Sequence, residues 1–91
     1  MILGVSYMIL GTVRGNIVSS RKYDNLLGFK LLLVEPYYGG EKIFVAADNI
    51  GAGVGELVLI TMGKNTQYAL DKAVPIDALV VGIVDTPPQR P

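Results

Sequence analysis

The chain contains no cysteine and no histidine among its 91 residues. Without cysteine, neither a disulfide nor a thiolate metal site can form. Without histidine, the sequence lacks the most frequent general base and the most frequent side-chain ligand of transition metals. Any catalysis would therefore have to rest on Asp, Glu, Lys, Tyr, Ser or Thr side chains.

An excess of charge and a long apolar run are also missing. Eight Lys and Arg residues balance eight Asp and Glu residues, whereas a nucleic-acid-binding protein normally carries a basic face. No stretch reaches the roughly 18 apolar residues of a membrane span. The apolar start, Met1–Val13, lacks the positive residues and the small-residue cleavage site of a signal peptide. We therefore expect a cytoplasmic protein with no nucleic-acid partner and no membrane partner.

Apolar residues, in contrast, are abundant: 51% of the chain is hydrophobic and only 18% is charged. A domain of this size buries only about 60–65% of the surface that its unfolded chain exposes. It cannot easily hide so many apolar side chains within one copy. Because large exposed apolar patches usually mark association surfaces, the composition predicts a single domain that forms an oligomer.

Five segments have the β-branched and apolar patterns of strands, bounded by Gly, Pro and polar turns. They are Met8–Ser19, Phe29–Val34, Lys42–Ala47, Leu57–Met62 and Ala78–Val84. We expect a bend or bulge in the first strand near Gly15. One short helix is predicted over Gly63–Lys72. The order of these elements predicts a mainly β fold, a small five-stranded OB-like antiparallel barrel with one short helix between the fourth and fifth strands.

The two ends of the chain differ from this barrel domain, which we place at residues 8–85. The tetrapeptide MILG occurs at Met1–Gly4 and again at Met8–Gly11, and the second copy leads directly into a strand pattern. We expect residues 1–7 to be an N-terminal extension and Met8 to be the natural start. Residues 86–91 contain three prolines, which predict an extended tail without regular structure.

The segment Asp48–Glu56, DNIGAGVGE, which we call the glycine loop, has glycine at every second position from 51 to 55. A dinucleotide-binding motif needs G-x-G-x-x-G at the start of a helix. Here the spacing is shorter, a strand follows, and the acids at both ends would repel phosphate. The pattern therefore favours a tight turn or close backbone packing.

Two further groups of residues allow more than one interpretation. Four carboxylates at predicted strand ends could form an acid–base pair or a metal site, but such positions more often cap turns; they are Asp48, Glu56, Asp77 and Asp85. A basic turn and several tyrosines could stack single-stranded nucleic acid, although tyrosine is also common at protein interfaces; they are Arg21, Lys22, Tyr23, Tyr37, Tyr38 and Tyr68. With a neutral chain, a protein interface is the better interpretation, and an OB-like barrel that binds single-stranded nucleic acid is the alternative.

Four stretches in fixed order resemble a known family. They are GTVRGNIVSSRK (Gly11–Lys22), LLGFKLLLVEP (Leu26–Pro36), VAADNIGAGVGELVLI (Val45–Ile60) and PIDALVVGIVD (Pro75–Asp85). Together they resemble the bacterial microcompartment vertex proteins, the pentameric shell proteins of carboxysomes and of ethanolamine- and propanediol-type metabolosomes. The chain departs from the family after the fourth strand, where G-S-S-A-R is frequent and Gly63–Gln67 reads GKNTQ.

The resemblance implies a homopentamer at the vertices of a polyhedral shell, in contact with hexameric shell proteins. It implies a structural protein, not an enzyme, with no catalytic residue, cofactor or metal. We expect the glycine loop to form the subunit interface, through Asn49, Ile50, Gly51, Ala52, Gly53, Val54, Gly55 and Glu56. We expect the rim that meets neighbouring shell proteins to include Arg21, Lys22 and Tyr23.

Overall fold

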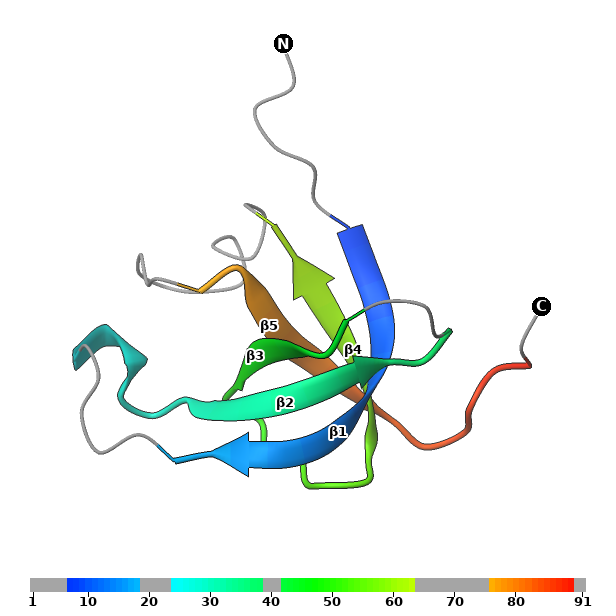
Figure 1. The fold of residues 1–91 in the computed structure, drawn as a ribbon, viewed down its shortest axis with the longest axis horizontal. Coiled ribbons are helices and arrows are strands. Elements are labelled where there is room, and N and C mark those ends of the chain that lie inside the picture. Colours follow the sequence, from blue (N-terminus) through cyan, green and yellow to red (C-terminus); the bar gives the residue numbers. More distant parts are fainter. Residues whose placement is uncertain (1–6, 19–23, 39–41, 64–75, 90–91) are drawn as a thin grey trace, which may run out of the picture.

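A computed structural model describes residues 7–18, 24–38, 42–63 and 76–89 of the chain. These described residues form five strands and one short 3₁₀ turn (Figure 1). In chain order these are β1 (Tyr7–Ile17), η1 (Asp24–Leu26), β2 (Lys30–Pro36), β3 (Phe44–Asp48), β4 (Leu57–Met62) and β5 (Ala78–Val84). The five predicted strands are confirmed, each with ends within two residues of the expected ones.

The strands close into a barrel in the order β1-β2-β3-β5-β4. Four of the contacts between neighbouring strands are antiparallel, as predicted. The fifth, between β3 and β5, is parallel and pairs Ala47 with Leu79. The reason is geometric: a closed ring with an odd number of strands cannot alternate in direction all the way around. The expectation of an antiparallel barrel therefore needs this one correction.

The pairing of β1 with β2 contains a bulge, which confirms the irregularity expected near Gly15. The first half of β1 pairs with β4, and the second half pairs with β2. The register shifts between Val13 and Gly15, so Arg14 is the extra residue that bends the strand. Its guanidinium reaches Glu35 at 2.6 Å, but both side chains are about half exposed, so this ion pair contributes little to stability.

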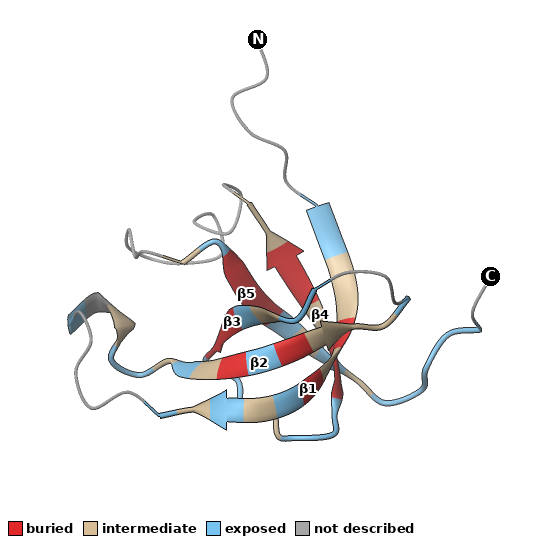
Figure 2. Ribbon diagram, in the orientation of Figure 1, coloured by how far each residue is buried: buried red, intermediate tan, exposed pale blue. Residues whose placement is uncertain are grey.

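The core forms from the inward positions of all five strands. Along β2, Leu32 and Val34 are fully buried while Leu33, between them, is exposed (Figure 2). This alternation follows from the two-residue period of a strand. The core comprises Val13, Leu32, Val34, Ala46, Ala52, Val58, Ile60, Ala78 and Val80. All are small or medium-sized aliphatic residues, as a narrow barrel requires.

The expected helix over Gly63–Lys72 lies almost wholly outside the described residues, and only Gly63, in a bend with φ of 87°, is described. That helix stays a prediction. Tyr7, expected in the N-terminal extension, instead pairs with Met62 at the start of β1. Of the expected tail, 86–91, the structure describes residues 86–89, which form neither helix nor strand. None of the helical segments in the described ranges is long and apolar enough to cross a membrane.

Gly11 tests how tightly this small core is packed. A Cβ at Gly11 would overlap Val34 Cγ1 and lie 3.2 Å from the backbone oxygen of Glu35. We expect Gly11→Ala to lower the free energy of unfolding by about 1–3 kcal/mol, because backbone cannot move aside as a flexible side chain can. The measurement is denaturant unfolding at fixed protein concentration. Gly15→Ala is the matched control, since its Cβ would meet only Leu33 Cδ1 at 3.7 Å; equal losses in the two variants would contradict the prediction.

Candidate functional site

The glycine loop joins β3 to β4 and crosses one end of the barrel, at the bottom of Figure 1. We call this the loop end. The first residue of β2, Lys30, pairs in register with the last residue of β3, Asp48, at this end. The opposite end, where β1 begins, β4 ends and β3 begins, we call the open end.

Asp48 shapes the first half of the glycine loop from inside the barrel. Its side chain is completely buried. One carboxylate oxygen, Oδ1, accepts the N–H of Ile50 at 3.2 Å. The other, Oδ2, accepts the N–H groups of Gly51 at 3.0 Å and Ala52 at 2.9 Å. A buried charge is tolerated when hydrogen bonds satisfy it, and here three backbone donors do so.

Glu56 shapes the second half of the loop in a similar way. Its Oε1 accepts the N–H of Gly53 at 2.6 Å, and its own N–H donates to the Gly53 carbonyl at 3.1 Å. The two acids at the ends of the motif thus fold the loop itself. The structural interpretation of these two carboxylates is confirmed.

Three further hydrogen bonds attach the loop to the barrel. Val13 exchanges two of them with it: its N–H donates to the Glu56 carbonyl at 2.9 Å, and its carbonyl accepts the Gly55 N–H at 2.8 Å. Lys30 Nζ donates to the Ala52 carbonyl at 2.6 Å. This distance is short even for a charge-assisted hydrogen bond. Sequence reasoning missed Lys30, although a lone cation at the start of an apolar strand was a usable signal.

The three glycines of the loop are not equivalent. Gly51 and Gly55 have φ values of 103° and 91°, a region that side chains rarely adopt. Gly53 does not, and a Cβ there would meet only Glu56 Oε1, at 3.4 Å. Apart from the adjoining residues, no heavy atom of the described ranges lies within 4 Å of a Cβ placed at Gly51 or Gly55. Within one chain these two glycines are needed for the positive φ angles of the turn, and not for close packing against another segment.

The loop presents aliphatic side chains to solvent while holding one inside. Ala52 is fully buried and belongs to the core of its own chain, so it is unavailable to a partner. Ile50 and Val54 are 50% and 59% exposed. Gly53 is half-buried, and the remaining residues of the predicted interface are exposed: Asn49, Gly51, Gly55 and Glu56. A loop fixed by hydrogen bonds that displays two large apolar residues has the features of a protein contact.

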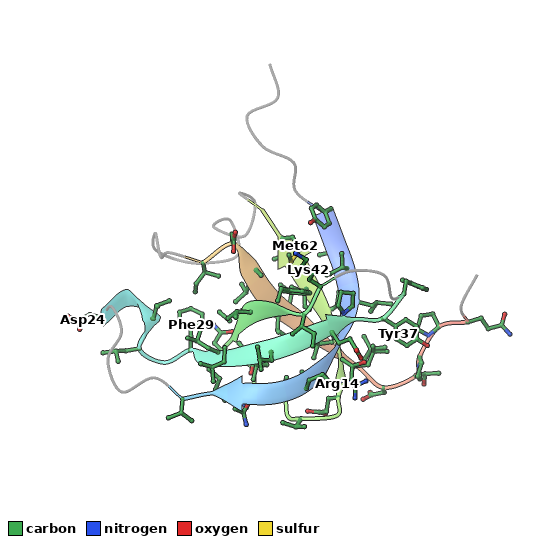
Figure 3. All side chains as sticks on the ribbon, in the orientation of Figure 1. Arg14, Asp24, Phe29, Tyr37, Lys42 and Met62 are labelled. Atoms are coloured by element: carbon green, nitrogen blue, oxygen red, sulfur yellow. The ribbon has the colours of Figure 1, made fainter. Side chains whose placement is uncertain are left out.

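Of the other basic and aromatic candidates, the structure describes Tyr37 and Tyr38. Arg21, Lys22 and Tyr23 lie outside the described residues, as does Tyr68. Tyr37 and Tyr38 pack edge to face against each other, with ring centres 5.2 Å apart, and the Tyr37 hydroxyl donates to the Pro88 carbonyl at 3.3 Å. Figure 3 shows Tyr37 beside the C-terminal tail.

The two remaining carboxylates are exposed and lie at strand ends, as expected for Asp77 just before β5 and Asp85 just after it. In the described ranges, no three acidic residues come together as metal ligands would.

Asp48 offers a direct test of how the loop is held. We expect Asp48→Ala to lower the free energy of unfolding by about 3 kcal/mol, because it leaves three backbone N–H groups without their charged acceptor. Asp48→Asn should lose less, since the amide keeps one acceptor oxygen. Asp85→Ala, which removes an exposed carboxylate, is the control. Denaturant unfolding of all three variants checks the order, and an Asp48→Ala variant as stable as Asp85→Ala would contradict it.

Comparison with known proteins places this barrel and its loop in a family. Residues 8–85 match the family model described as ethanolamine utilisation protein EutN/carboxysome. The carboxysome shell vertex protein CcmL of Gloeobacter violaceus is 40% identical, over 87% of this chain and 84% of that protein. The microcompartment shell vertex protein PduN of Salmonella typhimurium is 43% identical, over 87% of this chain and 97% of that protein.

Solved structures agree with the sequence matches. The crystal structure of EutN from Escherichia coli has a TM-score of 0.75 at 41% identity, covering 85% of this chain and 84% of that one. The pentameric shell protein MSM0273 of the RMM microcompartment has a TM-score of 0.80 at 35% identity, covering 91% of this chain and 98% of that one. The chain belongs to the EutN/CcmL family, whose named members include shell vertex proteins of carboxysomes and other bacterial microcompartments.

Proposed function

We propose that this chain forms a homopentamer that caps the vertices of a polyhedral bacterial microcompartment. The observation that carries the proposal is the match to a pentameric shell protein over 98% of that protein's length. The barrel domain therefore accounts for nearly the whole of a known pentamer subunit. The role is structural, and it places the chain in the shell of the compartment.

The exposed surface of the single chain supports such an assembly. Large apolar residues are exposed around the described barrel: Tyr7, Met8, Val18, Leu27, Leu33, Tyr38, Ile43, Val45, Ile50, Val54, Val81 and Ile83. They occur at both ends and on the outer face of the strands. A ring built by head-to-tail contact uses two different surfaces of each subunit. Apolar residues spread over several surfaces suit that arrangement better than a single patch would.

The glycine loop is our candidate for one of the two surfaces. Its backbone is fixed by Asp48, Glu56 and Lys30 before any partner arrives. A contact made by a preorganised loop loses little conformational entropy on binding. The exposed Ile50 and Val54 supply the apolar area, and the open space around Gly51 and Gly55 leaves room for a neighbouring backbone.

Gly53 tests this role, because a side chain there is tolerated within the chain itself. We expect wild-type protein to show the native mass of five subunits, and Gly53→Val to weaken or abolish the pentamer. A Cβ at Gly53 meets only Glu56 Oε1 within the chain, so lost assembly would report a contact between subunits. Gly82→Val on β5 is the control, since its Cβ would lie 3.9 Å from Leu59 Cβ. Light scattering at low micromolar concentration checks both, and an intact Gly53→Val pentamer would rule out this role for the loop.

We also propose that Arg21, Lys22 and Tyr23 lie at the rim that meets hexameric shell proteins. The support is their composition, two cations and one aromatic residue in a polar connection between two strands. Reversing both charges, Arg21→Glu with Lys22→Glu, should leave the free pentamer intact and give unclosed or elongated shells on co-expression with hexamer-forming proteins. Electron microscopy of the shells is the measurement, with omission of this chain as the reference. Closed shells of normal shape from the double variant would count against the rim assignment.

A further inference from the structure

The open end of the barrel carries an apolar hollow that sequence reasoning did not single out. Its volume is about 500 Å³, and it is lined by Tyr7, Ile9, Pro36, Lys42, Ile43, Phe44 and Met62. Ile9, Phe44 and Met62 pack against the core and form its floor. Tyr7 and Ile43 are about half exposed and form its walls. Figure 3 shows Lys42 and Met62 together at this end.

Among the described residues that line the hollow, the charged one is the exposed Lys42. The loop end has the complementary features. There, Ile50 and Val54 project aliphatic side chains into solvent, and Glu56 is an exposed carboxylate beside them. The described lining of the hollow therefore sets a cation beside apolar side chains, and the loop sets a carboxylate near two exposed apolar side chains. The cation at the loop end, Lys30, already donates to the Ala52 carbonyl.

We propose that the glycine loop of one subunit inserts Ile50 and Val54 into the hollow of the next subunit, with Glu56 beside Lys42. The proposal rests on the proposed pentamer and specifies which surfaces meet in it. A ring requires contact between two different surfaces of the same chain. The loop and the hollow lie at opposite ends of the barrel, so every subunit offers one of each to its two neighbours.

The loop can make this contact without refolding. Glu56 binds the Gly53 N–H through Oε1, and a carboxylate has further acceptor sites for an ammonium group. The backbone N–H of Ile50 is held by Asp48, and that of Gly53, the residue before Val54, is held by Glu56. The apolar patch formed by Leu33 and Val45 is paired across β2 and β3, and the nearby carboxylate of Glu35 is already paired with Arg14. The hollow is the more specific of the two surfaces.

The absence of cysteine makes the test direct. In the double variant Ile43→Cys with Val54→Cys, the only two thiols lie at opposite ends of one chain. Oxidation, or a short bis-maleimide, should link neighbouring subunits and give a ladder of bands that ends at five on a denaturing gel. The single variants Ile43→Cys and Val54→Cys are the matched controls. Each single variant has one thiol per subunit and can join at most two subunits, so neither should give a ladder.

The outcomes separate this inference from the proposed function. If the variant is a pentamer by native mass, gives no ladder and has both thiols open to maleimide, the hollow is free in the ring and the inference is wrong. The hollow would then be available to another protein, such as an acidic apolar peptide. If wild-type protein forms no pentamer, the proposed function itself fails.

A second measurement tests the charge contact without cysteine. Lys42→Met removes the cation, and Glu56→Gln removes the charge while keeping an acceptor for the Gly53 N–H. Each should weaken association by about 2–5-fold per contact, and the double variant should be no weaker than the single ones. Fully additive effects would overturn the contact between Lys42 and Glu56.

Discussion

The buried carboxylate of Asp48 is the interaction on which the loop end of the barrel depends. It gathers three consecutive backbone N–H groups, and in doing so it turns Ala52 into the core. The same turn carries Ile50 outward, where it is half exposed. The Asp48 carboxylate therefore fixes both the residue that faces the core, Ala52, and the residue that faces solvent, Ile50. The conformation that stabilises this end of the barrel is also the one that presents the surface proposed for assembly.

The barrel itself favours assembly. Five short strands enclose a narrow space that small aliphatic residues fill, so many apolar side chains remain outside. The odd number of strands forces one parallel contact, between β3 and β5, and only Ala47 and Leu79 pair there. A ring of subunits covers outer apolar surface that a single chain cannot bury. The exposed apolar surface of this small barrel is therefore consistent with a shell vertex protein, which assembles with other subunits.

Much of the fold could be predicted from local pattern. The strands follow from runs of β-branched and aliphatic residues between glycine, proline and polar turns. The bulge near Gly15 followed from a glycine within such a run. The parallel contact was missed because sequence patterns describe each strand alone and say nothing about how a ring of five must close. The glycine loop could be located from its spacing, but its three glycines looked alike, and only the backbone angles separate Gly53 from Gly51 and Gly55.

The sequence by itself determined the strands, the lack of cysteine and histidine chemistry, and the family, because these depend on residue type and order. The tertiary structure alone decided that Ala52 faces inward and that Lys30 holds the loop from another strand. It also brought Tyr7, Lys42 and Met62 into one hollow at the far end of the barrel. Residues so distant along the chain become neighbours only when the sheet closes. The sequence supplies the residues of these surfaces, but only the closed barrel brings them together.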